Sequence, residues 1–94
     1  MRMYDQIREV LRNLPLPLRV LDIEVEDYVD SGGDNALRVW VILDERIEDR
    51  SLSGPAVVRL KAAIRECLLR HGITEFPYIS LVKASERAAV DTGE

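Results

Sequence analysis

The chain has 94 residues, of which 47% are hydrophobic and 32% charged, and its formal net charge is −4. This length suits one domain rather than two, and the apolar content excludes a disordered chain, which could not offset its conformational entropy. The negative charge disfavours broad binding to a phosphate backbone, because such binding needs clustered lysines and arginines.

The sequence carries no expected membrane or secretion signal. Its apolar stretches are much shorter than the ~20 residues that span a bilayer, and residues 1–6 contain no hydrophobic core of a signal peptide. Cys67 is the one cysteine, so an intrachain disulfide is impossible and a reducing compartment is favoured. We therefore expect a cytoplasmic protein that does not contact membranes.

The N-terminal half is predicted to form a helix and a β-hairpin. Residues 3–14 place apolar side chains at helical spacing, and Pro15 and Pro17 end the helix. Residues 18–29 form a strand in which Leu21, Ile23 and Val25 alternate with Asp22, Glu24 and Glu26. Residues 30–35 are rich in turn formers, and residues 36–44 form the second strand. Its side chains point alternately to two faces, with one set consisting of Arg38, Trp40, Ile42 and Asp44.

The C-terminal half is predicted to form a long helix and a third strand. After a charged loop over residues 45–53, Ser53 is the expected N-cap, Pro55 lies in the first turn, and the helix runs to about His71. Gly72 can close the helix in the left-handed conformation. The third strand covers residues 76–83, and the tail of residues 85–94 is expected to hold at most a short helical turn at 86–90, with a loose end.

These elements predict an α+β fold with the order α-β-β-α-β. We expect a two-layer sandwich over residues 1–84, in which a three-stranded antiparallel sheet has the strand order 2-1-3. Both helices would cover the face that carries Leu21, Ile23 and Val25, and the other face would remain open.

The open face is the expected interaction site. Trp40, Ile42, Tyr78 and Val82 would form an aromatic and aliphatic patch there, together with Tyr28 and Arg38. Tryptophan and tyrosine are large and rigid, which suits them to anchoring interfaces. We expect a protein-interaction module that self-associates as a two-fold dimer. Two other interpretations stay open, namely packing across strands within one chain and coverage of the patch by the C-terminal tail.

A second apolar strip lies on the long helix. Val58, Ala62 and Leu69 are separated from the main apolar stripe by Lys61 and Arg65. A helix with apolar residues on two sides usually packs against two partners. The first helix is the simpler partner, and a second subunit is the alternative.

Residues with catalytic potential do not form a complete set, and no metal or cofactor is expected. His71 and Cys67 lie one helical turn apart, but both fall on the apolar stripe and no third group orients them. The row Asp22, Glu24 and Glu26 could attract a hard cation, although a solvated strand face is the simpler interpretation. We therefore expect no enzyme, and a small enzyme using Cys67 and His71 ranks last.

The order of the elements resembles small KH-type RNA-binding and ribosome-assembly domains, which implies nucleic-acid binding as an alternative function. The chain lacks the Gly-x-x-Gly loop of those domains. The basic side chains for this alternative would come from the long helix, where they point in more than one direction: Arg59, Lys61, Arg65 and Arg70.

Overall fold

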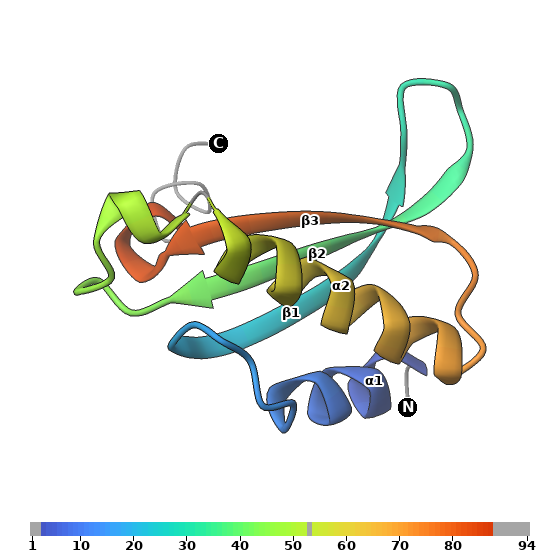
Figure 1. Cartoon of the computed structure of the whole chain (residues 1–94). Coiled ribbons are helices and arrows are strands. Elements are labelled where there is room, and N and C mark those ends of the chain that lie inside the picture. The colour runs from blue at the N-terminus through green and yellow to red at the C-terminus, as the bar shows by residue number, and fades with distance from the viewer. Residues whose placement is uncertain (1–2, 53, 88–94) are drawn as a thin grey trace.

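The computed structural model describes residues 3–52 and 54–87, and it confirms the α+β class and the α-β-β-α-β order (Figure 1). A short 3-10 helix, η1 (Asp49–Leu52), interrupts the loop predicted over residues 45–53. The elements are α1 (Met3–Arg12), β1 (Val20–Val29), β2 (Asn35–Leu43), η1 (Asp49–Leu52), α2 (Pro55–Arg70) and β3 (Phe76–Lys83).

The sheet is mixed, and its strand order is β1-β2-β3. β1 and β2 pair antiparallel, whereas β2 and β3 pair parallel. The predicted 2-1-3 order and the fully antiparallel sheet are therefore wrong. The physical reason is that β2 carries buried apolar side chains on both of its faces, which is typical of a central strand, while β1 alternates with acids and takes an edge.

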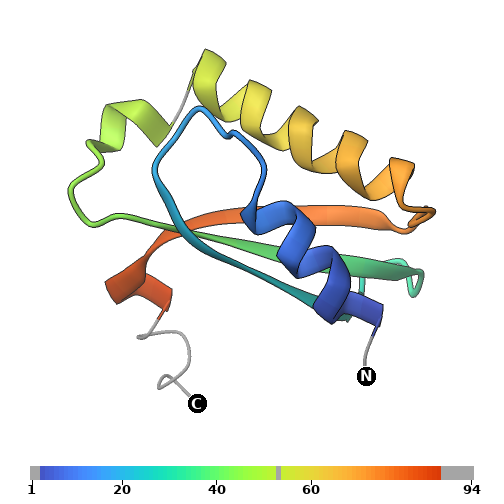
Figure 2. The same cartoon turned by 90° about the horizontal axis from the view of Figure 1, so that it is seen from below.

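One hydrophobic core joins α1, α2 and the inner face of the sheet. α2 lies over this face, and α1 lies alongside β1 at the edge of the sheet (Figures 1 and 2). The side chains with the least exposure come from all of these elements and include Leu11, Ile23, Leu37, Val39, Val41, Leu43, Leu60, Ile64 and Leu68.

Leu21 is an exception to the predicted core. The pairing of β1 with β2 shifts register between Val20 and Asp22, so that Leu21 is exposed and half-buried Val20 packs against the core instead. A β-bulge of this kind adds one residue to a strand and reverses the alternation beyond it.

The ends of α2 are set by glycines. Gly54 occupies the N-cap position, whereas the predicted cap, Ser53, lies outside the described residues. Gly72 adopts the predicted left-handed conformation with φ of 80°. Its N–H donates to the Leu69 carbonyl, and the Ile73 N–H donates to the Leu68 carbonyl. This closure turns the chain back toward β3.

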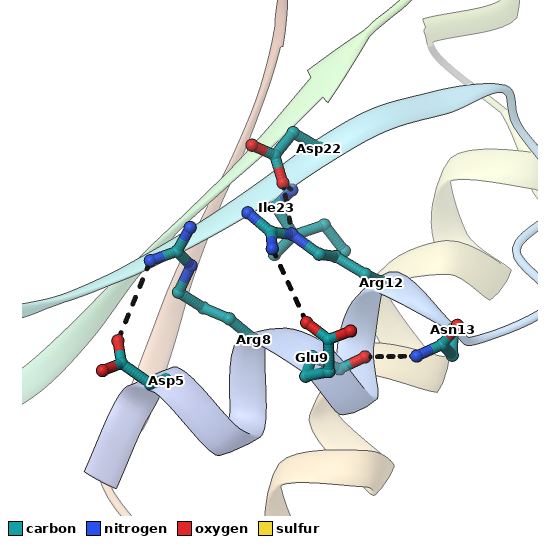
Figure 3. A network of polar contacts seen from close by, with 7 residues as sticks. All are labelled: Asp5, Arg8, Glu9, Arg12, Asn13, Asp22 and Ile23. Carbon is teal, nitrogen blue, oxygen red and sulfur yellow. Dashed lines mark hydrogen bonds and ion pairs between the residues drawn. The ribbon is translucent and has the colours of Figure 1, made fainter. Parts of the chain in front are cut away.

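Polar contacts fix α1 against β1. The Arg12 Nε donates to Asp22 Oδ1 at 2.6 Å, as Figure 3 shows, and the Tyr4 hydroxyl donates to Asp27 Oδ1 at 2.6 Å. Burial disfavours the charged form of Asp22, but the hydrogen bonds from Arg12 and the Ile23 N–H outweigh it and lower the pKa of Asp22. The hydrogen bond to Asp27 raises the pKa of Tyr4 to about 12.

Alkaline titration tests the contact between Tyr4 and Asp27. Because the folded pKa of Tyr4 lies above its ordinary value of 10.0, the contact stabilises the fold below that value and is lost as the pH rises through about 12. Tyrosinate absorbance at 295 nm should therefore show a late phase near pH 12. The amplitude of this phase should fall by one tyrosine in Tyr4→Phe, and its Tyr4 component should move toward pH 10 in Asp27→Asn. An unchanged late phase in Asp27→Asn would contradict this contact.

Candidate functional site

The six residues predicted for the interaction patch lie on the outer face of the sheet, opposite α2. The ladder places Glu26, Arg38 and Tyr78 in one row across the three strands, and Glu24, Trp40 and Ser80 in the next. The rows on either side contain the other predicted residues and consist of Tyr28, Ala36 and Phe76 at one end and Asp22, Ile42 and Val82 at the other.

The centre of this face is covered by side chains of the same chain. Trp40 is 9% exposed and Ile42 is 8% exposed. The guanidinium of Arg87 lies 4.5 Å from the centre of the Trp40 ring, and that of Arg38 lies 5.3 Å from it. Trp40 Nε1 donates to Glu26 Oε1 at 3.0 Å. Trp40 therefore cannot anchor a partner unless Arg87 moves away.

A C-terminal helical turn brings Arg87 to this position. Residues 84–87 form the turn, which lies on the opposite side of the sheet from α2 (Figure 2). The Ser85 hydroxyl donates to Glu45 Oε1 at 3.0 Å, and Arg87 donates to Glu24 Oε1 at 2.8 Å. The tail thus reaches the patch, which was one of the alternatives left open by the sequence. Residues 88–90 of the predicted turn lie outside the described residues.

An aromatic cluster remains accessible where β3 begins. Phe76 is 58% exposed and Tyr78 is 38% exposed. The Tyr78 ring contacts Phe76 and Tyr28 edge to face, at centroid distances of 4.8 Å and 5.4 Å, and Arg38 stacks on Tyr28 at 4.3 Å. The Tyr78 hydroxyl donates to Asp30 Oδ2 at 3.1 Å. Phe76 is absent from the predicted patch, although its alternation with Tyr78 along β3 places it on this face.

The acidic row on β1 does not gather into a metal site. Asp22 binds Arg12, Glu24 binds Arg87, and Glu26 accepts from Trp40. Within residues 3–52 and 54–87, no three histidine, cysteine, aspartate or glutamate side chains are grouped closely enough to hold a metal ion.

Asp44 is separately paired at the end of β2. It accepts hydrogen bonds from the Arg46 side chain and backbone N–H, and it lies 3.2 Å from Arg19 Nε. These contacts, led by the Arg46 side chain, lower the pKa of Asp44 to about 2.

Cys67 and His71 lie close together at the C-terminal end of α2. Cys67 is buried, and burial raises the pKa of its thiol, which disfavours the reactive thiolate. The Cys67 sulfur lies 3.9 Å from His71 Nδ1, but that nitrogen is 2.9 Å from the Cys67 carbonyl oxygen. A carbonyl accepts only from N–H, so His71 Nδ1 carries the proton and cannot act as a base toward the thiol.

The second apolar strip, on α2, lies over β3 and is not covered by α1. Val58 is 65% exposed and Leu69 is 63% exposed, so the prediction that the first helix covers them is wrong. A surface hollow of about 230 Å³ shows that Leu69 faces β3, because Leu69 lines it together with Phe76 and Pro77. Helical geometry places Val58 on the same side of α2 as Leu69, three turns earlier. α1 instead shares a different hollow with His71, on the opposite flank of α2.

Comparisons with protein-family models, with curated proteins and with solved structures gave no match. Among the described residues, no helix has both the length and the apolar character needed to cross a membrane.

Trp40 fluorescence tests the cover over the outer face, because the chain has one tryptophan. Arg87→Ala removes the guanidinium above the ring, so Trp40 emission should shift to the red and acrylamide quenching should increase. Arg50→Ala removes an arginine that pairs only with its exposed neighbour Glu48 among the described residues, and it should leave both signals unchanged. Identical quenching of native protein and Arg87→Ala would show that Arg87 does not shield the ring.

Proposed function

We propose that this chain is a non-catalytic protein-interaction module that self-associates, with its contact surface on the β3 side of the molecule. This proposal rests on where the large apolar side chains are exposed on the surface. Among the described residues there are six, and four of them belong to the β3 side: Val58, Leu69, Phe76 and Tyr78. Clustered exposed apolar residues mark interaction sites, whereas isolated ones are ordinary.

The surroundings of this surface favour a protein partner over a nucleic acid. Tyr78 donates its hydroxyl to Asp30, and Asp30 keeps a lowered pKa because the backbone N–H of Asp34 and other donors stabilise its charge. A carboxylate beside the most accessible aromatics repels phosphates. The net charge of −4 acts in the same direction.

The side chains that could take part in catalysis are buried or paired with other groups of the chain, which supports a binding role over a catalytic one. Asp22 and Glu24 are held by arginines, Cys67 is buried, and the Nδ1 of His71 is used by a carbonyl. An enzyme needs a nucleophile or a base that can reach its substrate. Asp22, Glu24 and Cys67 do not meet that requirement in the present geometry, and the His71 nitrogen that faces Cys67 is occupied by a carbonyl.

The partner we propose is a second copy of the chain. Across a two-fold axis, the accessible side chains of one copy would meet the same side chains of the other copy without a clash of charge. Phe76, Tyr78, Val58 and Leu69 are uncharged, so two such surfaces can approach without burying paired like charges at their centre. Two-fold dimers are also the commonest closed arrangement of identical chains.

Sedimentation velocity over a concentration series tests self-association. The native chain should show dimer mass at tens of micromolar, and Tyr78→Ala should weaken the dimer about tenfold or more, as truncation of an interface anchor costs about 1–2 kcal/mol or more. Val29→Ala is the control, because Val29 is also an exposed apolar residue but lies on β1. It should leave the dissociation constant within about twofold.

A native chain that remains monomeric at all concentrations would refute the proposal. Equal weakening by Tyr78→Ala and Val29→Ala would also refute the location of the contact on the β3 side.

A further inference from the structure

β3 has one free edge. It pairs with β2 along residues 76–83, and within residues 3–52 and 54–87 no strand lies on its other side. Along a strand, successive residues direct their backbone N–H and C=O groups to alternate sides. Pro77 cannot donate, and proline in an edge strand has its nitrogen on the side away from the ladder. Pro77, Ile79, Leu81 and Lys83 therefore direct their backbone groups to the free side.

On the free edge of β3, the backbone N–H groups of Ile79 and Leu81 have no acceptor among the described residues. The Lys83 N–H donates to the Glu86 side chain, which is consistent with this alternation. No hydrogen bond from another described residue reaches Ile79 or Leu81 outside the ladder with β2. Their N–H and C=O groups form a short template for a further strand.

The two edges of the sheet differ in their protection. β1 carries Asp22, Glu24, Glu26 and Asp27, and α1 lies alongside it. Charges on an edge strand and a covering helix both oppose pairing with another chain. β3 has no charge over residues 79–82, and Ile79 and Leu81 are only half-buried, so its inner side is not fully covered by the chain itself.

We propose that β3 pairs antiparallel with β3 of a second copy, which joins the two sheets into one continuous six-stranded sheet. This inference rests on the proposed self-association and specifies its geometry. With Ser80 opposite Ser80 of the second copy, Ile79 and Leu81 exchange backbone hydrogen bonds across the junction. On the outer face, Tyr78 lies opposite Val82 of the second copy, and aromatic side chains pair favourably with β-branched ones.

The helix layer fits the same two-fold axis. β3 has 8 residues and α2 has 16, so both are about 25 Å long. α2 runs antiparallel to β3, since it returns the chain between two parallel strands. A two-fold axis through the middle of β3 therefore brings Val58 of one α2 toward Leu69 of the other. The exposed strip on each helix is covered by the strip on the other.

The charged side chains beside the exposed apolar strip of α2 determine how the proposed dimerisation depends on salt concentration. Lys61 and Arg65 lie on this flank of α2, and their long side chains can keep their charged ends in water at the junction. Because both copies bring positive charge, added salt should strengthen the pairing or leave it unchanged. An acidic peptide as the occupant of the edge would show the opposite dependence.

Amide hydrogen exchange followed by NMR tests the pairing directly. In the native chain, the amides of Ile79 and Leu81 should exchange rapidly at low concentration. They should become protected at least tenfold at concentrations where the dimer forms. The amides of Ser80 and Val82, which point to β2, should be protected at both concentrations. A dimer without gained protection at Ile79 and Leu81 would overturn the edge pairing and leave self-association intact, whereas a monomer at all concentrations would overturn both.

A pair of variants at Leu81 provides the matched control. Leu81→Ala and Leu81→Pro both remove the side chain, but only the proline removes the outward N–H. Far-UV circular dichroism should verify that both are folded, and Leu81→Pro should then lose the dimer while Leu81→Ala retains most of it. Equal dimerisation of the two folded variants would contradict the role of this backbone donor. If Leu81→Pro does not fold, the exchange of the native chain decides the question.

Discussion

The structure depends on the need to cover β2 on both of its faces. Leu37, Val39 and Val41 point inward, where α1 and α2 supply apolar partners, while Trp40 and Ile42 point outward. In the part of the chain that the structure describes, no layer of helices lies on the outer side. A short C-terminal turn and a set of paired charged side chains cover it instead. Arginine is suited to this position because its planar guanidinium can stack on an indole ring while it binds a carboxylate.

Covering β2 in this way decides which surfaces remain available. The antiparallel neighbour, β1, is acidic and flanked by α1, and its carboxylates hold Arg12 and Arg87. The parallel neighbour, β3, pairs with β2 along one edge and has no strand along its other edge among the described residues. On that side, α2 leaves Val58 and Leu69 exposed. The asymmetry of the sheet thus leaves the helix flank, the strand edge and the aromatic cluster on the same side, which is the surface that we propose for self-association. In the proposed dimer, a second copy would cover all three.

Local patterns in the sequence were sufficient for much of this fold. The spacing of apolar residues predicted the positions of the helices and strands, and the position of Gly72 predicted the end of α2. The strand order required a comparison between strands, since apolar residues on both faces of residues 36–43 indicate a central strand rather than an open patch. Two features could not be read from spacing: the bulge that exposes Leu21, and the contact of Arg87 with Trp40, which joins segments far apart in the chain.

The central claim, that two β3 edges meet across a two-fold axis, is tested most directly by cross-linking at Ser80. In a Cys67→Ala background, Ser80→Cys places two thiols opposite each other at a Cα separation of about 4.5 Å, which lies within the range of a disulfide. Mild oxidation should yield a covalent dimer, whereas Val29→Cys on β1 should remain monomeric. A Ser80→Cys chain that stays monomeric under conditions of self-association, or equal cross-linking at both positions, would contradict the account.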